Sequence, residues 1–218
     1  MAAPMLVPEL AVPDLSPAAT TLRAFGFVPD AGLWRLGDQA LRVAENPSQG
    51  SGIGHGRIDH LALSVPDMDS ALAGLQAAGL HLDADITPNG PKLIPEFWDA
   101  GLRYVYLAGP DGARIELCQR LSGAGPKVGH DHIGIPCHDV AAMQRFFLGL
   151  GATPVASFAL DRPEGQIPVH FLAFEGGVIE LYQPSTPART ARGLWSRLLV
   201  RGLSAAVDGP EDLRLAPL

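Results

Sequence analysis

The chain has 218 residues, of which 47% are hydrophobic and 18% charged, and its formal net charge is −7. This composition is typical of a folded protein and excludes disorder, while a negative chain without a Lys/Arg cluster is poorly suited to nucleic acid or an anionic membrane surface. No apolar run reaches the roughly 18 residues of a membrane span, and the Pro-rich start lacks the basic region of a secretory signal. We expect a cytoplasmic protein whose two cysteines, Cys118 and Cys137, are buried thiols.

The first part of the chain reads as a degenerate copy of a unit that returns twice further along. ELAVPDL at 9–15 predicts a strand, and 16–27 has helical spacing with Ser16 placed to cap the helix. GDQALRVAEN at 37–46 predicts the strand that closes the copy. Residues 1–50 are therefore expected to form a degenerate β-α-β-β-β-like module, followed by a Gly- and Ser-rich linker.

This first copy lacks the polar residues that distinguish the later two. By alignment, Val7 or a neighbour stands where the later copies have a histidine, and Val43 stands where they have a glutamate. Glu9 and Glu45 are interpreted as solvated charges rather than ligands. The first module is therefore predicted to be structural.

The second module spans about 57–121. Asp67 or Asp69 can cap its helix, which is expected to stop at Gly79. The predicted order is β-α-β-β-β, with strands at 58–65, 81–87, 101–108 and 113–120, a Pro-rich loop at 88–100 and a tight Gly-Pro-Asp-Gly turn at 109–112.

The third module, 128–184, repeats this order. Its predicted elements are a helix at 139–149, strands at 131–137, 153–160, 168–174 and 178–183, and a loop at 161–168. The remaining segment, 185–218, is expected to hold a helix over 188–206 that packs on the domain or a partner subunit, followed by an irregular tail. The basis for this helix is the spacing of Trp195, Leu198 and Leu199.

Strand alternation places the histidine of each later copy on a face with small neighbours. His60 shares its face with Ala62, away from the aliphatic row, and His132 shares its face with Gly134. Small neighbours would leave room for a metal, water and substrate.

The closing strands place one glutamate of each copy in the same way. Glu116 and Glu180 each lie between Ile and Leu. A carboxylate in a buried strand is costly unless charged or hydrogen-bonded partners compensate it. Convergence on a divalent cation would supply that compensation, so the repeat predicts a metal site held by His60, Glu116, His132 and Glu180.

At these residues the chain resembles the vicinal oxygen chelate superfamily: glyoxalase I, methylmalonyl-CoA epimerase, extradiol dioxygenases, and the fosfomycin and bleomycin resistance proteins. The matching features are the Asp-His openings at 59–60 and 131–132, the turn at 109–112 and the Ile-Glu-Leu closures. The resemblance covers roughly 57–184. It implies an α+β fold in which paired β-α-β-β-β modules form a curved mixed-sheet cleft around a divalent metal.

The members of this superfamily differ in the number of residues that bind the metal. His60, Glu116, His132 and Glu180 match the four ligand positions of the glyoxalase I type, and epimerase-type sites carry Gln or Glu at the equivalent of Glu116. Extradiol dioxygenases and fosfomycin resistance enzymes resemble the pattern only at His60, His132 and Glu180. Bleomycin-binding members lack the metal set.

The resemblance implies a glyoxalase I-like lyase or isomerase, or an epimerase, that moves a proton next to a carbonyl. Bound Zn, Ni, Co or Mn would polarise the substrate oxygens and hold the developing enediolate, and Glu180 or Glu116 would act as general base. Two alternatives stay open. One is an Fe(II) extradiol-type dioxygenase with Glu116 as a bystander, and the other is a non-catalytic small-molecule binding or resistance protein.

Several residues near the expected cleft are candidates for substrate contacts. Arg103 and Arg162 are placed to grip a carboxylate such as that of glutathione, and Tyr182 shares the face of its neighbouring glutamate by strand parity. Loops 88–100 and 161–168 are candidate lids. Further candidates for an apolar pocket are Trp98, Tyr104, Tyr106 and His170.

An odd number of modules leaves the assembly open. Modules two and three can build one cleft within a chain or exchange between the chains of a homodimer, since the linker 121–129 is short and Gly-rich. The first module would then cover an exposed sheet edge or pair across a dimer. We expect a small-molecule substrate and a homodimer.

Overall fold

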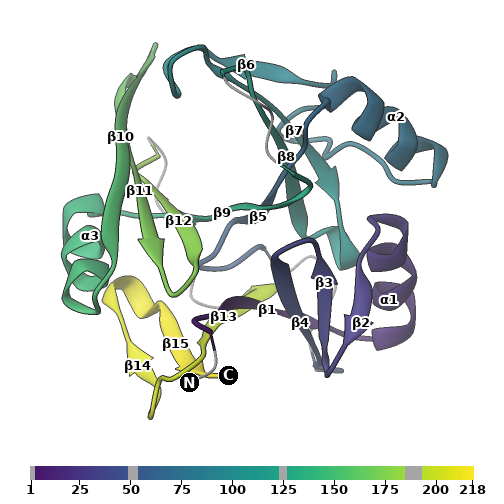
Figure 1. Ribbon diagram of the computed structural model, residues 1–218, viewed down its shortest axis with the longest axis horizontal. Helices are drawn as coiled ribbons and strands as arrows, with labels where there is room; N and C mark the ends of the chain where they lie inside the picture. Colours follow the sequence, from purple (N-terminus) through teal and green to yellow (C-terminus); the bar gives the residue numbers. More distant parts are fainter. Residues whose placement is uncertain (1–2, 49–53, 123–126, 185–192) are drawn as a thin grey trace.

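The computed structural model describes residues 3–48, 54–122, 127–184 and 193–218. They form two β-sheets that share one hydrophobic core, with helices packed along their sides (Figure 1). None of the described helices combines the length and apolarity that a membrane crossing needs. The α-helices are α1 (Leu15–Ala24), α2 (Met68–Ala77) and α3 (Val140–Gly149), and 3₁₀ turns lie at η1 (Pro110–Gly112) and η2 (Pro210–Asp212).

The larger sheet carries the second and third modules. Its strands are β5 (His60–Ser64), β6 (Lys92–Ile94), β7 (Leu102–Ala108), β8 (Arg114–Arg120), β9 (Gly129–Pro136), β10 (Thr153–Arg162), β11 (Gly165–Phe174) and β12 (Gly177–Tyr182). The order is β10-β11-β12-β9-β5-β8-β7-β6. At its centre β5 and β9 run antiparallel, and β8 and β12 flank them as parallel partners.

The smaller sheet repeats this plan with the two ends of the chain. Its strands are β1 (Leu6–Val12), β2 (Val28–Asp30), β3 (Leu33–Leu36), β4 (Gln39–Glu45), β13 (Trp195–Val200), β14 (Val207–Asp208) and β15 (Arg214–Pro217). The order is β14-β15-β13-β1-β4-β3-β2. Here β1 and β13 form the antiparallel centre, and β4 and β15 are their parallel partners. The predicted α+β fold of paired modules with a curved mixed sheet is confirmed.

The predicted C-terminal helix is wrong. In the described part of this segment, 193–218, β13 pairs with β1, and the expected irregular tail forms β14, η2 and β15. Leu198 packs into the main core while Leu199 packs into a small cluster on the opposite face of the sheet. A strand that is buried on both faces loses its alternating pattern, so its apolar residues mimic helical spacing. Residues 188–192 of the expected helix lie outside the described part.

The C-terminal segment is an abbreviated fourth copy of the unit. The turn before β15, Gly-Pro-Glu-Asp, repeats the Gly-Pro-Asp-Gly turn before β8. Glu211 and Asp111 occupy the same left-handed conformation, with φ of 56° and 52°. The first module therefore has a partner within the chain, and the larger sheet also pairs its two modules within the chain.

Aspartates cap all three described α-helices at their N-termini. The carboxylates of Asp14, Asp67 and Asp139 each accept a hydrogen bond from a backbone N–H of the first turn. Ser16, the expected cap of α1, lies inside the helix, because Asp14 is two residues earlier and takes the capping position.

Two segments differ locally from the expected modules. The strand predicted at 81–87 is reduced to a single bridge between Leu82 and Leu107, and β6 forms instead within the predicted loop 88–100. The loop predicted at 161–168 is mostly strand, because β10 and β11 extend into a long hairpin. Pro168 did not stop β11, because it pairs with Ala159 of β10 and lies just beyond the residues of β11 that pair with β12.

Strand register defines which residues of the smaller sheet take the places of the predicted ligands. In the larger sheet Ala62, five positions before the capping Asp67, pairs with Glu116. In the smaller sheet the residue five positions before the capping Asp14 pairs with Arg42. Arg42 therefore occupies the place that Glu116 has in the larger sheet. The sequence alignment had assigned this place to Val43, one residue further along the chain. Val7 stands at the place of His60, as the alignment expected.

Glu9 is a buried charge, not a solvated one, with 4% of its surface exposed. Its carboxylate accepts hydrogen bonds from Arg197 Nε at 2.8 Å and Nη2 at 3.2 Å, and from Ser196 Oγ at 2.8 Å. An ion pair thus ties β1 to β13 in the centre of the smaller sheet. Glu45, in contrast, is exposed as expected.

Candidate metal centre

Two histidines meet across the central strand pair of the larger sheet. His60 lies opposite Gly134, and His132 lies opposite Ala62. The glycine is necessary, since a Cβ atom at position 134 would overlap the ring of His60. The two Nε2 atoms lie 3.1 Å apart, and both histidines are buried.

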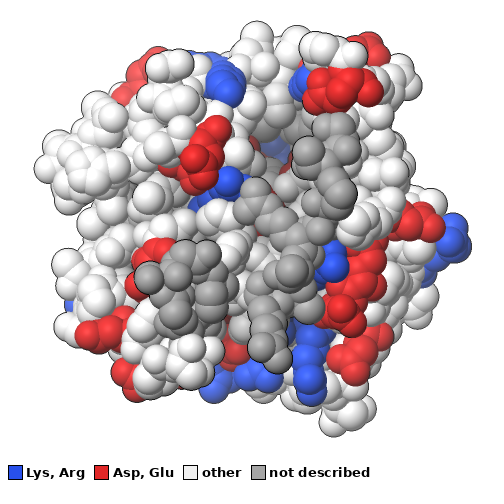
Figure 2. Space-filling view, turned by 180° about the vertical axis from the view of Figure 1, so that it is seen from behind, with Lys and Arg blue, Asp and Glu red and all other residues white. Residues whose placement is uncertain are grey.

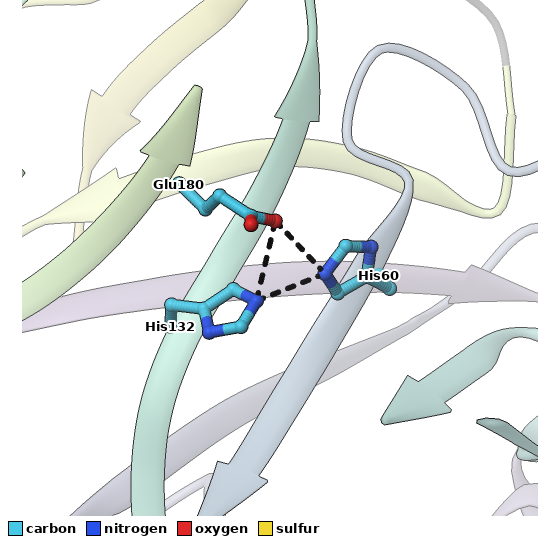
Figure 3. Close-up of side chains that lie close together, drawn as sticks. All are labelled: His60, His132 and Glu180. Atoms are coloured by element: carbon cyan, nitrogen blue, oxygen red, sulfur yellow. Dashed lines mark hydrogen bonds and ion pairs between the residues drawn. The ribbon is translucent and has the colours of Figure 1, made fainter. Parts of the chain in front are cut away.

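Two glutamates complete the cluster from the flanking parallel strands. Glu116 Oε2, from β8, lies 3.2 Å from Nε2 of both His60 and His132. Glu180 Oε2, from β12, lies 3.6 Å and 3.4 Å from the same two atoms. Figure 3 shows His60, His132 and Glu180 directed at a common point. The structure thus brings all four predicted ligands together.

These separations suit a shared divalent cation. Ligand atoms at about 2.1 Å from a tetrahedral zinc ion lie about 3.4 Å from one another. Ring nitrogens of histidine and carboxylate oxygens form the donor set that zinc and its first-row neighbours accept. The separations between the two histidines, and between each histidine and each glutamate, therefore fit the metal that the sequence pattern predicts.

Each histidine is anchored at its other ring nitrogen by the aspartate that precedes it. Asp59 Oδ2 lies 3.2 Å from Nδ1 of His60, and Asp131 Oδ1 lies 2.9 Å from Nδ1 of His132. A carboxylate at this position holds the proton on Nδ1, so that Nε2 presents its lone pair to a cation. The aspartates thus hold both rings with Nε2 facing the cluster.

Arginines hold these aspartates in turn. Arg114 Nη1 lies 2.8 Å from Asp59 Oδ1, and its Nε lies 3.3 Å from Asp83 Oδ2. Arg120 Nη2 lies 3.5 Å from Asp131 Oδ2. The anchoring carboxylates are therefore compensated on the side away from the histidines.

Burial and proximity shift the pKa values within the cluster. Burial alone would lower the pKa of His60, but hydrogen bonds to Asp59 and Glu116 outweigh it and raise this pKa to about 9. Burial would raise the pKa of Glu116, but hydrogen bonds from His132 and His60 lower it to about 2. The pKa of His132 is also well above its usual value, because Glu180 and Asp131 overcome the effect of burial. Without a metal, protons on the imidazoles balance the carboxylates.

The cluster faces a cavity of about 310 Å³. Its remaining wall is largely apolar and comes from β6, β7, the loop between them, and the β10–β11 hairpin. Wall residues include Ile94, Phe97, Leu102, Tyr104, Leu160 and Val169. Figure 2 shows the molecule from behind, where both basic and acidic side chains lie around the grey residues.

Tyr106, Tyr182 and Arg162 lie where the sequence placed them, at the cavity wall. The hydroxyl of Tyr106 lies 3.3 Å from Nδ1 of His60. The ring of Tyr182 has its centroid 6.4 Å from that of His60. Both phenols therefore border the candidate metal site.

Three other predicted contacts do not line this cavity. Arg103 lies on the outer face of β7, because Tyr104 on the next position points inward, and it pairs with Asp69 at 2.7 Å. His170 lies on the outer face of β11, where its Nδ1 is 2.9 Å from Ser157 Oγ. Trp98 sits behind the wall, with the guanidinium of Arg120 4.0 Å from its ring centre.

Sequence reasoning missed the roles of Asp59, Asp131 and Phe97. The recurring Asp-His pair was the available signal for the two aspartates, whereas nothing in the local pattern marks Phe97 as a wall residue. The two cysteines are buried free thiols, as expected. Cys118 lies beside Glu116, and burial together with this carboxylate raises the pKa of its thiol well above the usual value.

The paired modules, the curved sheet and the inward-facing cluster together define the vicinal oxygen chelate fold, in agreement with solved structures. Glyoxalase I from Zea mays is similar to this chain with a TM-score of 0.68 and 16% identity, over 90% of this chain and 73% of that chain. A putative dioxygenase from Bacillus subtilis is similar with a TM-score of 0.57 and 16% identity, over 94% and 70% of the two chains. No protein-family model and no curated protein sequence matches the chain.

Proposed function

We propose that this protein is a divalent-metal-dependent enzyme that moves a proton next to a carbonyl, as glyoxalase I-like lyases, isomerases and epimerases do. The observation that carries the proposal is a buried pair of imidazole Nε2 atoms 3.1 Å apart, with two carboxylate oxygens that each lie 3.2–3.6 Å from both of them. The fold that 90% of this chain shares with glyoxalase I from Zea mays supports the same proposal.

His60, Glu116, His132 and Glu180 would hold the metal. When bound, a divalent cation supplies a Lewis acid that polarises adjacent oxygens of a substrate. Such polarisation acidifies the carbon next to the carbonyl, and a nearby carboxylate can then take its proton. Glu180 is the better candidate for this base, because its oxygen lies further from the histidines than that of Glu116.

The phenols and the buried wall would complete the site. Tyr106 and Tyr182 border the histidines, so their hydroxyls are within reach of an oxygen of a bound substrate. The apolar wall would exclude water, which protects a carbanion-like species from uncontrolled protonation. Glu180 would return the proton to the neighbouring carbon and so complete an isomerisation.

Metal analysis tests the proposal directly. Protein purified without added metal is expected to carry about one divalent ion per chain, and His60→Ala and His132→Ala are expected to lose it. His170→Ala is the matched control, because this histidine lies on the outer face of the sheet. NMR in D₂O then tests the proposed proton transfer. It follows exchange of the proton next to the carbonyl in two kinds of substrate, hemithioacetals of 2-oxoaldehydes and 2-methyl-branched acyl thioesters. The proposal would be contradicted if the parent protein carried no metal and if His60→Ala and His132→Ala bound added metal as tightly as the parent protein does.

An Fe(II) dioxygenase is the second candidate. His60, His132 and Glu180 by themselves form a compact ligand group, which is the two-His, one-carboxylate set of non-haem iron oxygenases. The similarity to the Bacillus subtilis putative dioxygenase supports it. Oxygen uptake with Fe(II) and a panel of catechols separates the two candidates. Glu116→Ala, which removes the ligand atom altogether, should leave an oxygenase active, whereas it should abolish a four-ligand isomerase or epimerase.

A homodimer and a non-catalytic binding role are further proposals for this fold. Light scattering of purified protein tests whether it is a homodimer. If the metal-loaded protein binds a ligand and leaves it chemically unchanged, that result would favour a binding role over an isomerase and over a dioxygenase.

A further inference from the structure

A short segment bridges the two edges of the larger sheet. β6 and β10 are its outermost strands, at opposite ends of the strand order. Residues 95–98, here called the strap, follow β6 and reach the β10–β11 hairpin, which Figure 1 shows rising on the far side of the open curve of the sheet. The strap therefore joins two edges that the sheet itself keeps apart.

An ion pair fixes one side of the strap. Arg162 Nη1, at the end of β10, donates to Glu96 Oε1 at 2.8 Å. Burial would raise the pKa of Glu96, but the hydrogen bond from Arg162 outweighs it and keeps this pKa below its usual value. The carboxylate is therefore charged at neutral pH, and the pair acts as a latch between strap and hairpin.

Phe97 fixes the strap from within. Its ring centroid lies 4.9 Å from that of Phe158 and 5.4 Å from that of Phe171, and only 2% of the residue is exposed. Phe97 is also part of the cavity wall. One aromatic side chain therefore both anchors the strap and forms part of the cavity wall.

The strap carries features of a segment that can open. Trp98 has φ of 56°, a left-handed conformation that is unfavourable for a bulky residue unless its contacts hold it. Oε2 of Glu96 is shielded from solvent and has no hydrogen-bond partner among the described residues. Opening would relieve both costs, because the backbone could relax and the oxygen could return to water.

Both arginines of the described cavity wall already pair with carboxylates. Arg162 pairs with Glu96 through Nη1, and Arg114 pairs with Asp59 and Asp83. Arg103, the other candidate for a carboxylate grip, lies outside the cavity and pairs with Asp69. The wall beyond the metal cluster therefore suits an apolar group.

We infer that the strap selects the substrate: the cleft takes a neutral, apolar molecule with two adjacent oxygens at its metal-facing end, and Phe97 sets the permitted length. The Glu96–Arg162 pair keeps the strap closed over the bound molecule. This inference rests on the proposed function and narrows its substrate class. A substrate with a free carboxylate in its tail, such as a glutathione conjugate, falls outside that class.

Hydroxamic acids are suitable probes, because they chelate a metal through two adjacent oxygens and carry any chosen tail. Calorimetry on the Zn²⁺-loaded protein would compare benzohydroxamate, its longer 4-phenyl derivative, and the hydroxamate of succinic acid, which has an anionic tail. Benzohydroxamate is expected to bind at least about tenfold more tightly than either of the others, the scale on which apolar pockets discriminate.

Variants of the strap separate size from latching. Phe97→Leu and Phe97→Ala should bring the 4-phenyl derivative to within a few-fold of benzohydroxamate, and the milder substitution covers failure of the alanine variant to fold. Glu96→Gln should accelerate binding and release of benzohydroxamate in stopped-flow measurements. Asp69→Asn is the matched control, since it breaks a comparable ion pair with Arg103 on the outer face.

The outcomes distinguish this inference from the proposed function. No binding of any hydroxamate to metal-loaded protein would overturn both. Equal affinity for benzohydroxamate and the succinic probe would overturn the inference alone. A Phe97→Leu variant that folds and ranks the three probes as the parent protein does would also overturn it, as would a Glu96→Gln variant with unchanged rates.

Discussion

The Nε2 atoms of His60 and His132 lie 3.1 Å apart in the middle of the larger sheet, although the two residues are separated by 72 positions in the chain. At that distance two N–H groups cannot point at each other, because their hydrogens would collide. A shared cation uses both lone pairs and at the same time neutralises Glu116 and Glu180. The apposition of these rings is the basis of the predictions that follow.

Removing the charge of an anchoring aspartate should weaken metal binding without removing a ligand. In Asp131→Asn the ring of His132 loses the carboxylate that holds its proton on Nδ1. The metal dissociation constant is expected to rise about 10- to 100-fold, which is the usual effect of replacing a residue that hydrogen-bonds to a metal ligand. Competition with a chromophoric chelator measures it, with Asp69→Asn as control. An unchanged dissociation constant would show that the aspartate has no orienting role.

Adding one methyl group opposite His60 should disturb the site. In Gly134→Ala the new Cβ atom would overlap the ring of His60, so the ring or the strand must move. Metal affinity should fall while the protein stays folded. Gly74→Ala is the control, because this helical glycine has nothing within 4 Å of the added atom. That variant should be neutral or more stable by about 0.5–1 kcal/mol. Metal titrations and thermal melts of both variants test the pair, and equal metal affinity would refute the steric argument.

Metal affinity should depend steeply on pH. The pKa of His60 is raised to about 9 in the metal-free protein, and binding must displace its proton from Nε2. Displacement of the His60 proton should therefore raise affinity by roughly tenfold per pH unit up to about pH 9, and displacement of a proton from His132, whose pKa is also raised, should steepen the rise. Glu116, with a pKa of about 2, adds no dependence in this range. Chelator competition between pH 6.5 and 9.5 gives the slope. Calorimetry in buffers of different ionisation enthalpy counts the released protons, and zero release at neutral pH would contradict the raised pKa.

The ion pair of the smaller sheet should matter for stability but not for metal binding. Glu9→Gln leaves Arg197 without its carboxylate partner. A loss of about 1–2 kcal/mol in the free energy of unfolding is expected, below the value for a fully buried pair because Arg197 is partly exposed. Glu45→Gln, an exposed change on β4, should have almost no effect. Urea unfolding of the metal-free proteins measures both, and a stabilised Glu9→Gln variant would show that the desolvation of Glu9 outweighs its ion pair.

Local patterns were sufficient for much of the larger sheet. β5, β9 and α2 lie within two residues of their predicted bounds, because the internal repeat presents the same strand and helix pattern twice. The prediction failed where no second copy supported the local pattern. β13 is buried on both faces and resembled a helix, and β6 has only three residues within a Pro-rich stretch.

The sequence by itself determined the fold class and the face of each strand on which His60, Glu116, His132 and Glu180 lie, because alternation along a strand and an internal repeat are local properties. Only the tertiary structure decided how distant edges meet. Strand pairing made the C-terminal segment the partner of the first module, and sheet curvature brought Phe97 to the β10–β11 hairpin while it left Arg103 and His170 outside. Curvature and pairing arise from packing of the whole core, to which residues far apart in the chain contribute, so no local period encodes them.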